Sequence, residues 1–305
     1  MGKKSRKNRA HDVPEGMSRR QAKLAARAAE RARLAGNPRP FEGFAAEADL
    51  VALREFAPSV VVPVKVTDSD RNIFLCTVLP GGIAALTRED KDGVTAFVAM
   101  QTQARSNDAA ADLARALLWA RDAEPGQQLT GATDGEAVEL SGLLAGVSPD
   151  DIVVHQDFEW WLPEGIERTQ LVEQNLRVAN DSLLPSYRLD IDVAGAVWWI
   201  DPGERAHIRW VRLEKEAELL DALARVHAAD HLTMGEGTKF AGVFRADGVL
   251  VPVWDLDNTK PYDSWNEAIE DADKRIKDAL AVTEPLTAEE RKSRETIVSR
   301  QVTLR

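Results

Sequence analysis

Residues 60–101 read VVVPVKVTDSDRNIFLCTVLPGGIAALTREDKDGVTAFVAMQ, and the fold class follows from this stretch. Short apolar runs alternate here with Asp-Ser-Asp, Pro-Gly-Gly and Asp-Lys-Asp-Gly, which are residue types that favour tight turns. We therefore predict strands at residues 60–66, 73–79, 83–87 and 94–101. Because the connections are only a few residues long, neighbouring strands are expected to pair antiparallel, as in a meander.

Helical and strand patterns continue on both sides of this stretch. Apolar residues recur at helical spacing in several segments, which predicts helices at 47–56, 107–121, 166–179, 214–229, 264–282 and from 287 onward. Ser264-x-x-Glu267 and Thr287-x-x-Glu290 have the spacing of capping boxes at two of these helix starts. Further strands are predicted at 152–162, 187–193, 196–200, 207–213, and in a hairpin of 240–245 and 249–256 across Asp247-Gly248.

This order of elements indicates an α+β fold, because runs of short strands are backed by helices without strict alternation. Five glycines and two prolines fall within residues 122–150, which places a boundary there. We expect two sub-domains of mostly antiparallel strands backed by helices, preceded by a basic N-terminal arm. The boundaries are 1–39 for the arm, 40–122 for the first sub-domain, 123–150 for a Gly-rich connection, 151–283 for the second sub-domain and 284–305 for a C-terminal helix and tail.

Charge divides the chain unevenly. Residues 1–39 contain twelve Lys or Arg and three Asp or Glu, a net charge of +9. The remaining 266 residues contain 27 basic and 47 acidic side chains, a net charge of −20, so that the whole chain carries −11. A basic arm on an acidic body is typical of a protein whose arm contacts a polyanion while its body remains soluble.

The arm itself is predicted to be polar and disordered before residue 18 and helical near 18–34, where alanine dominates. Four cationic residues spaced four apart in this helix form one basic stripe: Arg19, Lys23, Arg27 and Arg31. The candidate polyanion-binding residues are Lys3, Lys4, Arg6, Lys7, Arg9, Arg19, Arg20, Lys23, Arg27 and Arg31. Because no aromatic residues lie among these charges, binding is expected to be independent of sequence.

Composition favours a cytoplasmic protein. No apolar stretch reaches the roughly 20 residues that a membrane helix needs, and no hydrophobic segment follows the charged start of the chain. Cys76 is the single cysteine, so we interpret it as a small buried apolar residue rather than as part of a disulfide or thiolate metal site. No cofactor is predicted.

Two histidine patterns suggest metal or acid–base chemistry, and each has a simpler explanation. His155, Asp157 and Glu159 would share one face of the predicted strand, which is equally the pattern of a half-buried strand with a solvated side. His227 and His231 have the i, i+4 spacing of helical zinc sites, but the glutamate of the H-E-x-x-H pattern is absent. Structural roles are favoured for both sets.

Carboxylates at predicted strand ends are a further candidate site. Asp190, Asp192 and Asp255, with Asp201 and Asp257 nearby in sequence, could hold Mg²⁺ for chemistry on a phosphate if the strand ends converge. Such pairs are frequent in a chain with fifty acidic residues, so we treat them only as weak metal candidates together with His227 and His231.

Aromatic residues concentrate in the second half, where five tryptophans fall within about fifty residues: Trp160, Trp161, Trp198, Trp199 and Trp210. Adjacent tryptophans on a strand point to opposite sides, so both faces of that sheet are expected to be covered. Core packing is favoured over an aromatic ligand groove. The chain contains neither a phosphate-binding loop nor a nucleophile elbow, and we recognise no catalytic motif.

The sequence resembles an actinobacterial protein family of unknown function. The segments that carry the resemblance are MSRRQAKLAAR (17–27), PFEG (40–43), EADLVALRE (47–55), LLDALAR (219–225) and GVLVPVWDL (248–256). They are spread over nearly the whole chain. The resemblance implies no activity, since the family has none assigned, and no catalytic residue is transferred from it.

These observations favour a non-enzymatic interaction protein whose basic arm binds a polyanion, with the ribosome or other RNA as the leading partner and a protein partner for the acidic body. Two alternatives remain open. One is a metal-dependent enzyme that acts on a nucleotide or phosphate ester through the carboxylates named above. The other is a homo-oligomeric structural protein in which the arm of one subunit attracts the body of another.

Overall fold

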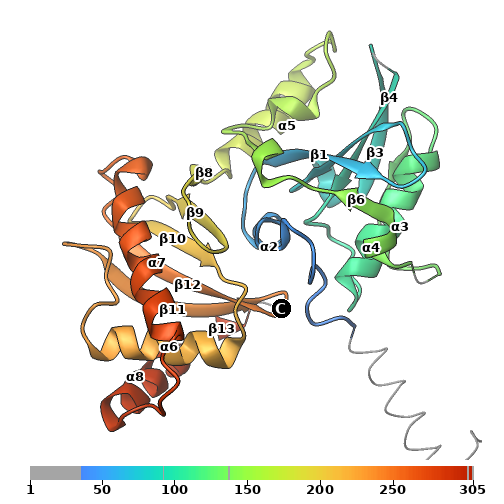
Figure 1. The fold of residues 1–305 in the computed structure, drawn as a ribbon. Helices are drawn as coiled ribbons and strands as arrows, with labels where there is room; N and C mark the ends of the chain where they lie inside the picture. The colour runs from blue at the N-terminus through green and yellow to red at the C-terminus, as the bar shows by residue number, and fades with distance from the viewer. Residues whose placement is uncertain (1–35, 92, 137, 301, 304–305) are drawn as a thin grey trace, which may run out of the picture.

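The computed structural model describes residues 36–91, 93–136, 138–300 and 302–303, which form two β-sheets with helices packed on their faces (Figure 1). The predicted α+β class is confirmed, and most strand pairs are antiparallel. The predicted arm helix near 18–34 lies outside the described residues. The helices are α2 (Glu47–Glu55), α3 (Ala109–Asp122), α4 (Leu140–Leu143), α5 (Gln170–Asp181), α6 (Glu216–Ala228), α7 (Asn266–Leu280) and α8 (Ala288–Ser299).

The first sheet has the strand order β5-β3-β4-β2-β1-β6, and β7 also pairs with β1. Its strands are β1 (Val60–Val66), β2 (Asn72–Cys76), β3 (Ala85–Asp90), β4 (Gly93–Ala99), β5 (Gln128–Leu129), β6 (Leu144–Gly146) and β7 (Val153–Val154). All four strands predicted within residues 60–101 are present, and β1 has the predicted bounds.

The meander predicted for these strands is wrong, because β4 inserts between β3 and β2 and pairs with β2 in parallel. After β2 the chain passes through a 3-10 turn, η1 (Pro80–Gly82). Gly81 and Gly82 both have positive φ, 72° and 64°. Glycine adopts this conformation readily, so the chain turns away from β2 instead of folding back along it.

The second sheet has the order β13-β11-β12-β10-β9-β8. Its strands are β8 (Ser186–Arg188), β9 (Ala196–Ile200), β10 (Ala206–Val211), β11 (Lys239–Ala246), β12 (Val249–Leu256) and β13 (Val302–Thr303). The predicted hairpin of β11 and β12 is confirmed, and Asp247 and Gly248 adopt φ of 44° and 79° in its turn. A side chain at Gly248 would lie 2.5 Å from the Pro38 carbonyl oxygen, so this turn packs directly on the chain that leads into the body.

Both faces of the second sheet are covered, as the adjacent tryptophans predict. Trp199 belongs to a core with residues of α6 and α7. Trp198 points to the opposite face and packs in a core that includes Leu50 and Val51 of α2 and residues of the first sheet. Helix α2 therefore lies between the two sheets (Figure 1). Trp198 and Trp210 are fully buried, in agreement with the predicted core role.

Ion pairs also join α2 to the second sheet. Arg188 Nε of β8 donates to Asp49 Oδ1 of α2 over 2.7 Å. Arg54 of α2 contacts Asp247 Oδ1 in the β11–β12 turn over 2.5 Å. The side chains of both aspartates are at most 8% exposed. Pairs that are this strongly desolvated require a partner on each side, so they fix the position of α2 against the second sheet.

The strand predicted at 152–162 is wrong beyond Val154. Residues after β7 cross the outer face of the first sheet, and Glu159–Trp161 form a 3-10 turn, η3. The indole N–H of Trp160 donates to Ser59 Oγ and that of Trp161 to the Val78 carbonyl, over 2.9 and 3.0 Å. These bonds, to the residue before β1 and to the loop after β2, replace the strand pairing that alternation suggested.

The two predicted capping boxes differ in outcome. Thr287 and Glu290 form one at the start of α8, as predicted. Ser264 instead lies in a 3-10 turn, η4 (Tyr262–Trp265), and donates to the Pro261 carbonyl, so α7 starts at Asn266 without a side-chain cap. Within the described ranges, no helix combines the length and the apolar character needed to cross a membrane.

Candidate ligand-binding face of the first sheet

Alternate residues of the first sheet point away from α3 and form its outer face, which carries a ladder of aromatic rings. Phe74 of β2 and Phe97 of β4 are register partners, and their rings stack with centroids 5.4 Å apart and planes 18° apart. Trp160 also contacts Phe97, with ring centroids 6.0 Å apart and planes 31° apart. The aromatic ladder thus joins β2, β4 and Trp160, and Phe74 is its member nearest to β1.

The segment of residues 155–165, which we call the cover segment, holds Trp160 in this position. Ser59 donates its hydroxyl to the Asp157 carbonyl over 2.8 Å and accepts the Trp160 indole N–H. Phe158 stacks on Trp161 with ring centroids 4.2 Å apart. Hydrogen bonds and ring contacts therefore both anchor the cover segment against the first sheet.

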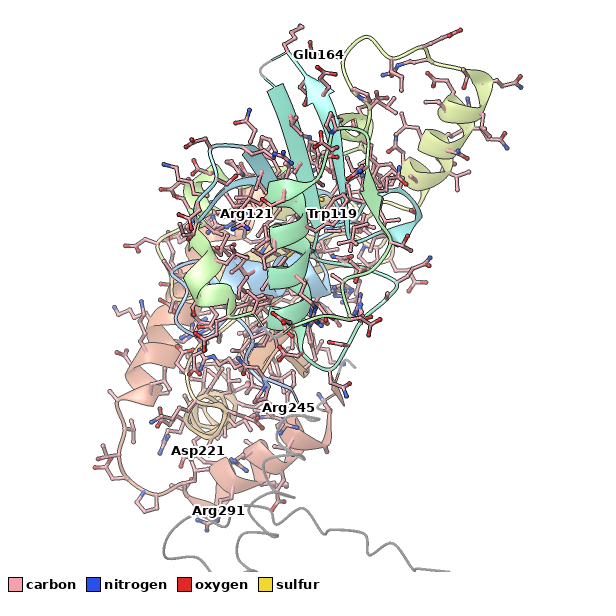
Figure 2. All side chains as sticks on the ribbon, turned by 90° about the vertical axis from the view of Figure 1, so that its right-hand side faces the viewer. Trp119, Arg121, Glu164, Asp221, Arg245 and Arg291 are labelled. Carbon is pink, nitrogen blue, oxygen red and sulfur yellow. The ribbon has the colours of Figure 1, made fainter. Side chains whose placement is uncertain are left out.

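Arg88 of β3 links the sheet to the cover segment. Its guanidinium carbon lies 4.6 Å from the centroid of Phe97, a cation–π contact. The same group donates to Asp90 over 3.1 Å and to the Trp160 carbonyl over 3.3 Å. Lys91 and Glu164 pair at the edge of this region, and Figure 2 shows Glu164 beyond the ends of the strands.

Two hollows adjoin the ladder, and both are lined by Asn72 and Phe74. The first, of about 610 Å³, lies between the sheet and the cover segment and is also lined by Arg88, Phe97 and Trp160. The second, of about 850 Å³, is lined on its other sides by residues of β1 and by the chain around β6, including Pro63, Lys65, Gly146 and Ser148. Volumes of this size accommodate a small organic ligand.

The predicted trio of His155, Asp157 and Glu159 is not brought together. His155 faces Trp160 with ring centroids 6.1 Å apart. Burial lowers the pKa of His155, and the charge of Asp157 acts in the opposite direction. Asp157 accepts the backbone N–H of Glu159, whereas the Glu159 carboxylate pairs with Arg168. An acid–base cluster is therefore not formed, although His155 lines the first hollow.

The weak metal candidates are also dispersed. Asp190 and Asp192 follow β8, whereas Asp255 lies on β12, with β9 and β10 between these strands. Asp255 Oδ1 is 3.0 Å from His207 Nδ1, an arrangement that the sequence did not suggest. Among the described residues, no three His, Cys, Asp or Glu side chains gather in a way that could hold a metal ion.

His227 and His231 do not share one helix face, for a local reason. Helix α6 ends at Ala228, and Asp230 adopts φ of 59°, so His231 does not continue the face that carries His227. His227 Nδ1 lies 3.0 Å from Ser293 Oγ of α8. Cys76 is completely buried, as predicted, and burial raises the pKa of its thiol far above the usual range.

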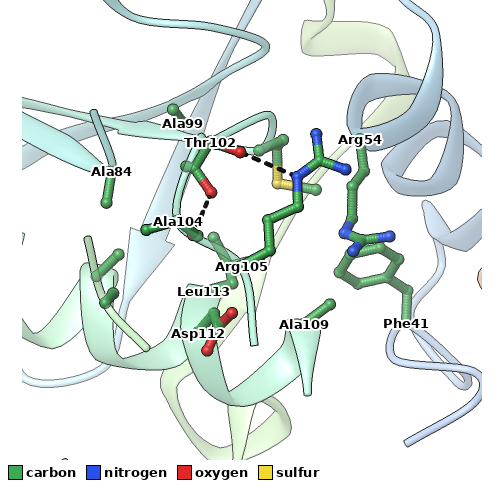
Figure 3. Close-up of a pocket in the computed structure, with 13 residues that line it drawn as sticks. Phe41, Arg54, Ala84, Ala99, Thr102, Ala104, Arg105, Ala109, Asp112 and Leu113 are labelled. Carbon is green, nitrogen blue, oxygen red and sulfur yellow. Dashed lines mark hydrogen bonds between the residues drawn. The ribbon is translucent and has the colours of Figure 1, made fainter. Parts of the chain in front are cut away.

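A smaller cavity lies where α2, the end of β4 and α3 meet (Figure 3). Arg54 and Arg105 line it together with Phe41, and Arg105 donates to the Thr102 carbonyl over 3.0 Å. Its volume of about 30 Å³ is room for a water molecule rather than for an organic ligand. We therefore assign this cavity to packing.

The aromatic ladder was not among the sequence predictions. Phe74 and Phe97 each lie in an apolar run, so hydrophobicity alone does not indicate which side of the strand faces the core. The available signal was the alternation Asn72, Phe74, Cys76 set against Ile73 and Leu75. The candidate arm residues Lys3, Lys4, Arg6, Lys7, Arg9, Arg19, Arg20, Lys23, Arg27 and Arg31 lie outside the described residues.

Comparison with known proteins gives one relationship. No curated protein matches the chain, and no solved structure matches it. The model of one family matches residues 40–305, which is the whole body without the basic arm. That family is described as a family of unknown function, DUF5926. Because the match covers most of the sequence, the chain belongs to the DUF5926 family, which confirms the resemblance to a family without an assigned activity.

Proposed function

We propose that the protein is a non-enzymatic cytoplasmic interaction protein whose basic arm, residues 1–39, binds a polyanion, with the ribosome or other RNA as the partner. The observation that carries the proposal is the opposition of charge, +9 in the arm against −20 in the body. Lysine and arginine side chains that neutralise phosphates release condensed counterions, which supplies affinity without reading the sequence.

The start of the body supports this proposal, because the chain is held firmly where the arm ends. Arg39 Nε donates to Glu47 over 2.5 Å, and an Arg39 Nη donates to the Leu213 carbonyl over 3.2 Å. Phe41 is buried in the core that α2 shares with both sheets. The arm would therefore tether a bound polyanion to the body at one fixed position, near Arg39 and Phe41.

The phosphate-ester alternative has less support. Asp255 is bonded to His207, and two strands separate it from the strand that precedes Asp190. Residues that must act on one substrate have to lie within hydrogen-bond reach of it, whereas Asp255 lies on β12 and Asp190 lies in the loop after β8. We therefore do not develop that reaction.

Removing residues 1–35 is expected to abolish cosedimentation with ribosomes at about 0.1 M salt, because the phosphate contacts of the arm are lost. The measurement compares the full chain and residues 36–305 by sedimentation and immunoblotting. Equal thermal unfolding midpoints would show that the truncated body is intact. Unchanged cosedimentation after truncation would refute the proposal.

The same pair of proteins separates RNA binding from self-association. If the arm of one copy attracts the body of another, the native mass of the full chain should exceed one subunit at low salt and fall as salt is added, because screening weakens exposed charge pairs. A monomer at both salt concentrations, together with loss of ribosome binding on truncation, supports the RNA proposal.

A further inference from the structure

We infer that the outer face of the first sheet binds an unpaired nucleobase stacked on Phe74, so that the favoured RNA is single-stranded at this point. The inference rests on the proposed function for the presence of RNA. It adds a second contact, made by the body, that distinguishes single-stranded from double-stranded partners.

The aromatic ladder is open at Phe74. One face of Phe97 is occupied by Arg88, and Phe74 stacks alongside the ring. The side of Phe74 turned away from Phe97 looks toward β1, the other neighbour of β2. On β1 the register partner of Phe74 is Pro63, which is exposed and has a short side chain. A planar base placed beside Phe74 would therefore extend an existing stack by one ring.

The second hollow provides space for a base beside Phe74. The hollow of about 850 Å³ is bounded by Pro63, Lys65 and Phe74 on the sheet and by Gly146 and Ser148 opposite. This volume is within the range that holds a ligand of nucleotide size. Because the hollow is open to solvent, a nucleotide within a longer strand can enter without a break in the strand.

Polar groups that could recognise a nucleotide line the hollow beside Phe74. Lys65 and Asn72 are exposed, and their side chains make no hydrogen bond or ion pair with other residues in the described part of the chain. An asparagine amide can donate to and accept from the edge of a base, and a lysine can pair with a phosphate. Thr95 and Arg88 continue this polar row across β4 and β3, in register with Asn72.

Charge around the hollow explains why the arm is needed as well. Lys65 and Arg71 are offset by Asp70 and Asp151, all of which line the hollow. This face therefore has no excess positive charge with which to attract RNA over long distances. The arm supplies that attraction, and the stack on Phe74 adds affinity only for a base that is not already stacked in a duplex.

Replacing Phe74 by leucine tests the inference in the full chain, because leucine keeps the apolar bulk but removes the aromatic face. Fluorescence anisotropy would measure binding to a labelled single-stranded RNA and to a duplex of equal length. We expect the variant to bind the single strand about 5- to 150-fold more weakly, as for loss of one stacked base, and the duplex with unchanged affinity.

Two control variants make the result specific. Phe74→Tyr retains a stacking ring and should bind the single strand like the parent protein. Tyr262→Ala removes an exposed aromatic ring that stacks on Tyr187 of the second sheet, at 3.9 Å, and should also leave binding unchanged. Equal thermal unfolding midpoints of the variants would exclude a general loss of structure.

The outcomes separate this inference from the proposed function. If the parent protein binds neither RNA, the proposed function fails and the stacking site falls with it. If the parent binds RNA and Phe74→Leu binds the single strand equally well, the stacking site is refuted while the arm proposal remains. An equal loss of affinity for the single strand and for the duplex would also refute the stacking site. Removing a contact to an unpaired base should not weaken binding to a duplex, whose bases are already stacked.

Discussion

Replacing Arg212 by leucine is expected to destabilise the protein by about 3–5 kcal/mol, the usual effect of removing one member of a buried ion pair. The Arg212 side chain is 0% exposed. Its guanidinium donates to Asp273 of α7 over 2.7 Å and to both carboxylate oxygens of Glu214 over 3.1 Å, and it lies 4.8 Å from the ring of Trp210.

The cost arises from the carboxylate that would be left behind. The Asp273 side chain is only 4% exposed, and without Arg212 its remaining ion partner is the half-exposed Lys277, 2.5 Å away. A charge that is buried with too few partners loses the hydration that it has in the unfolded chain, and the interior does not replace it.

Equilibrium denaturation of the parent and of Arg212→Leu would measure this effect. Lys215→Ala is the matched control. Lys215, like Arg212, pairs with a nearby glutamate, in this case Glu218, but its side chain is 82% exposed. Exposed pairs contribute about 0–1 kcal/mol, so the control should remain close to the parent. Equal unfolding free energies for the Arg212 and Lys215 variants would contradict a stabilising role for the buried network.

Replacing Trp198 by alanine is expected to cost about 3–5 kcal/mol, the usual range for deleting a large aromatic side chain from a core. Trp198 is 0% exposed and meets Phe56 edge-on at 6.4 Å. Although it belongs to the second sheet, it packs with Leu50 and Val51 of α2, and α2 also packs on the first sheet. The variant therefore leaves a cavity at the junction of the two sheets.

Denaturant unfolding followed by circular dichroism would measure the loss. Trp119→Ala serves as the control, because Trp119 lies on the outer part of α3 (Figure 2) and only partly contacts the core. Its replacement should cost clearly less than that of Trp198. A Trp198 variant as stable as the Trp119 variant would show that the shared core does not hold the sheets together.

Local patterns in the sequence predicted most helices and strands, but they did not predict which strands pair in the first sheet. The strands at 60–66 and 196–200 have the predicted bounds, because each is a dense run of β-branched and aromatic residues between clear turns. Alternation determines which residues share a face of a strand, but it does not determine which strand lies alongside. The parallel pairing of β2 with β4 depends instead on the path through Gly81 and Gly82.

The cover segment shows a second limit of local patterns. Residues 155–159 alternate as a strand does, yet the indole N–H groups of Trp160 and Trp161 donate to Ser59, just before β1, and to Val78, just after β2. Contacts between residues about one hundred positions apart, such as Ser59 with Trp160, have no signature in a single sequence. For the same reason the stacked pair of Phe74 and Phe97, which depends on strand order, emerged only from the structure.

The proposed role of the arm can be tested by the salt dependence of RNA binding in the full chain. One variant changes the basic stripe, Arg19, Lys23, Arg27 and Arg31, to glutamine. A control with the same net charge changes four exposed lysines of the body, Lys215, Lys239, Lys274 and Lys292. We expect the slope of log affinity against log salt to become shallower by about 3 in the stripe variant and to stay unchanged in the control. Equal slopes for the two variants would contradict binding through the arm.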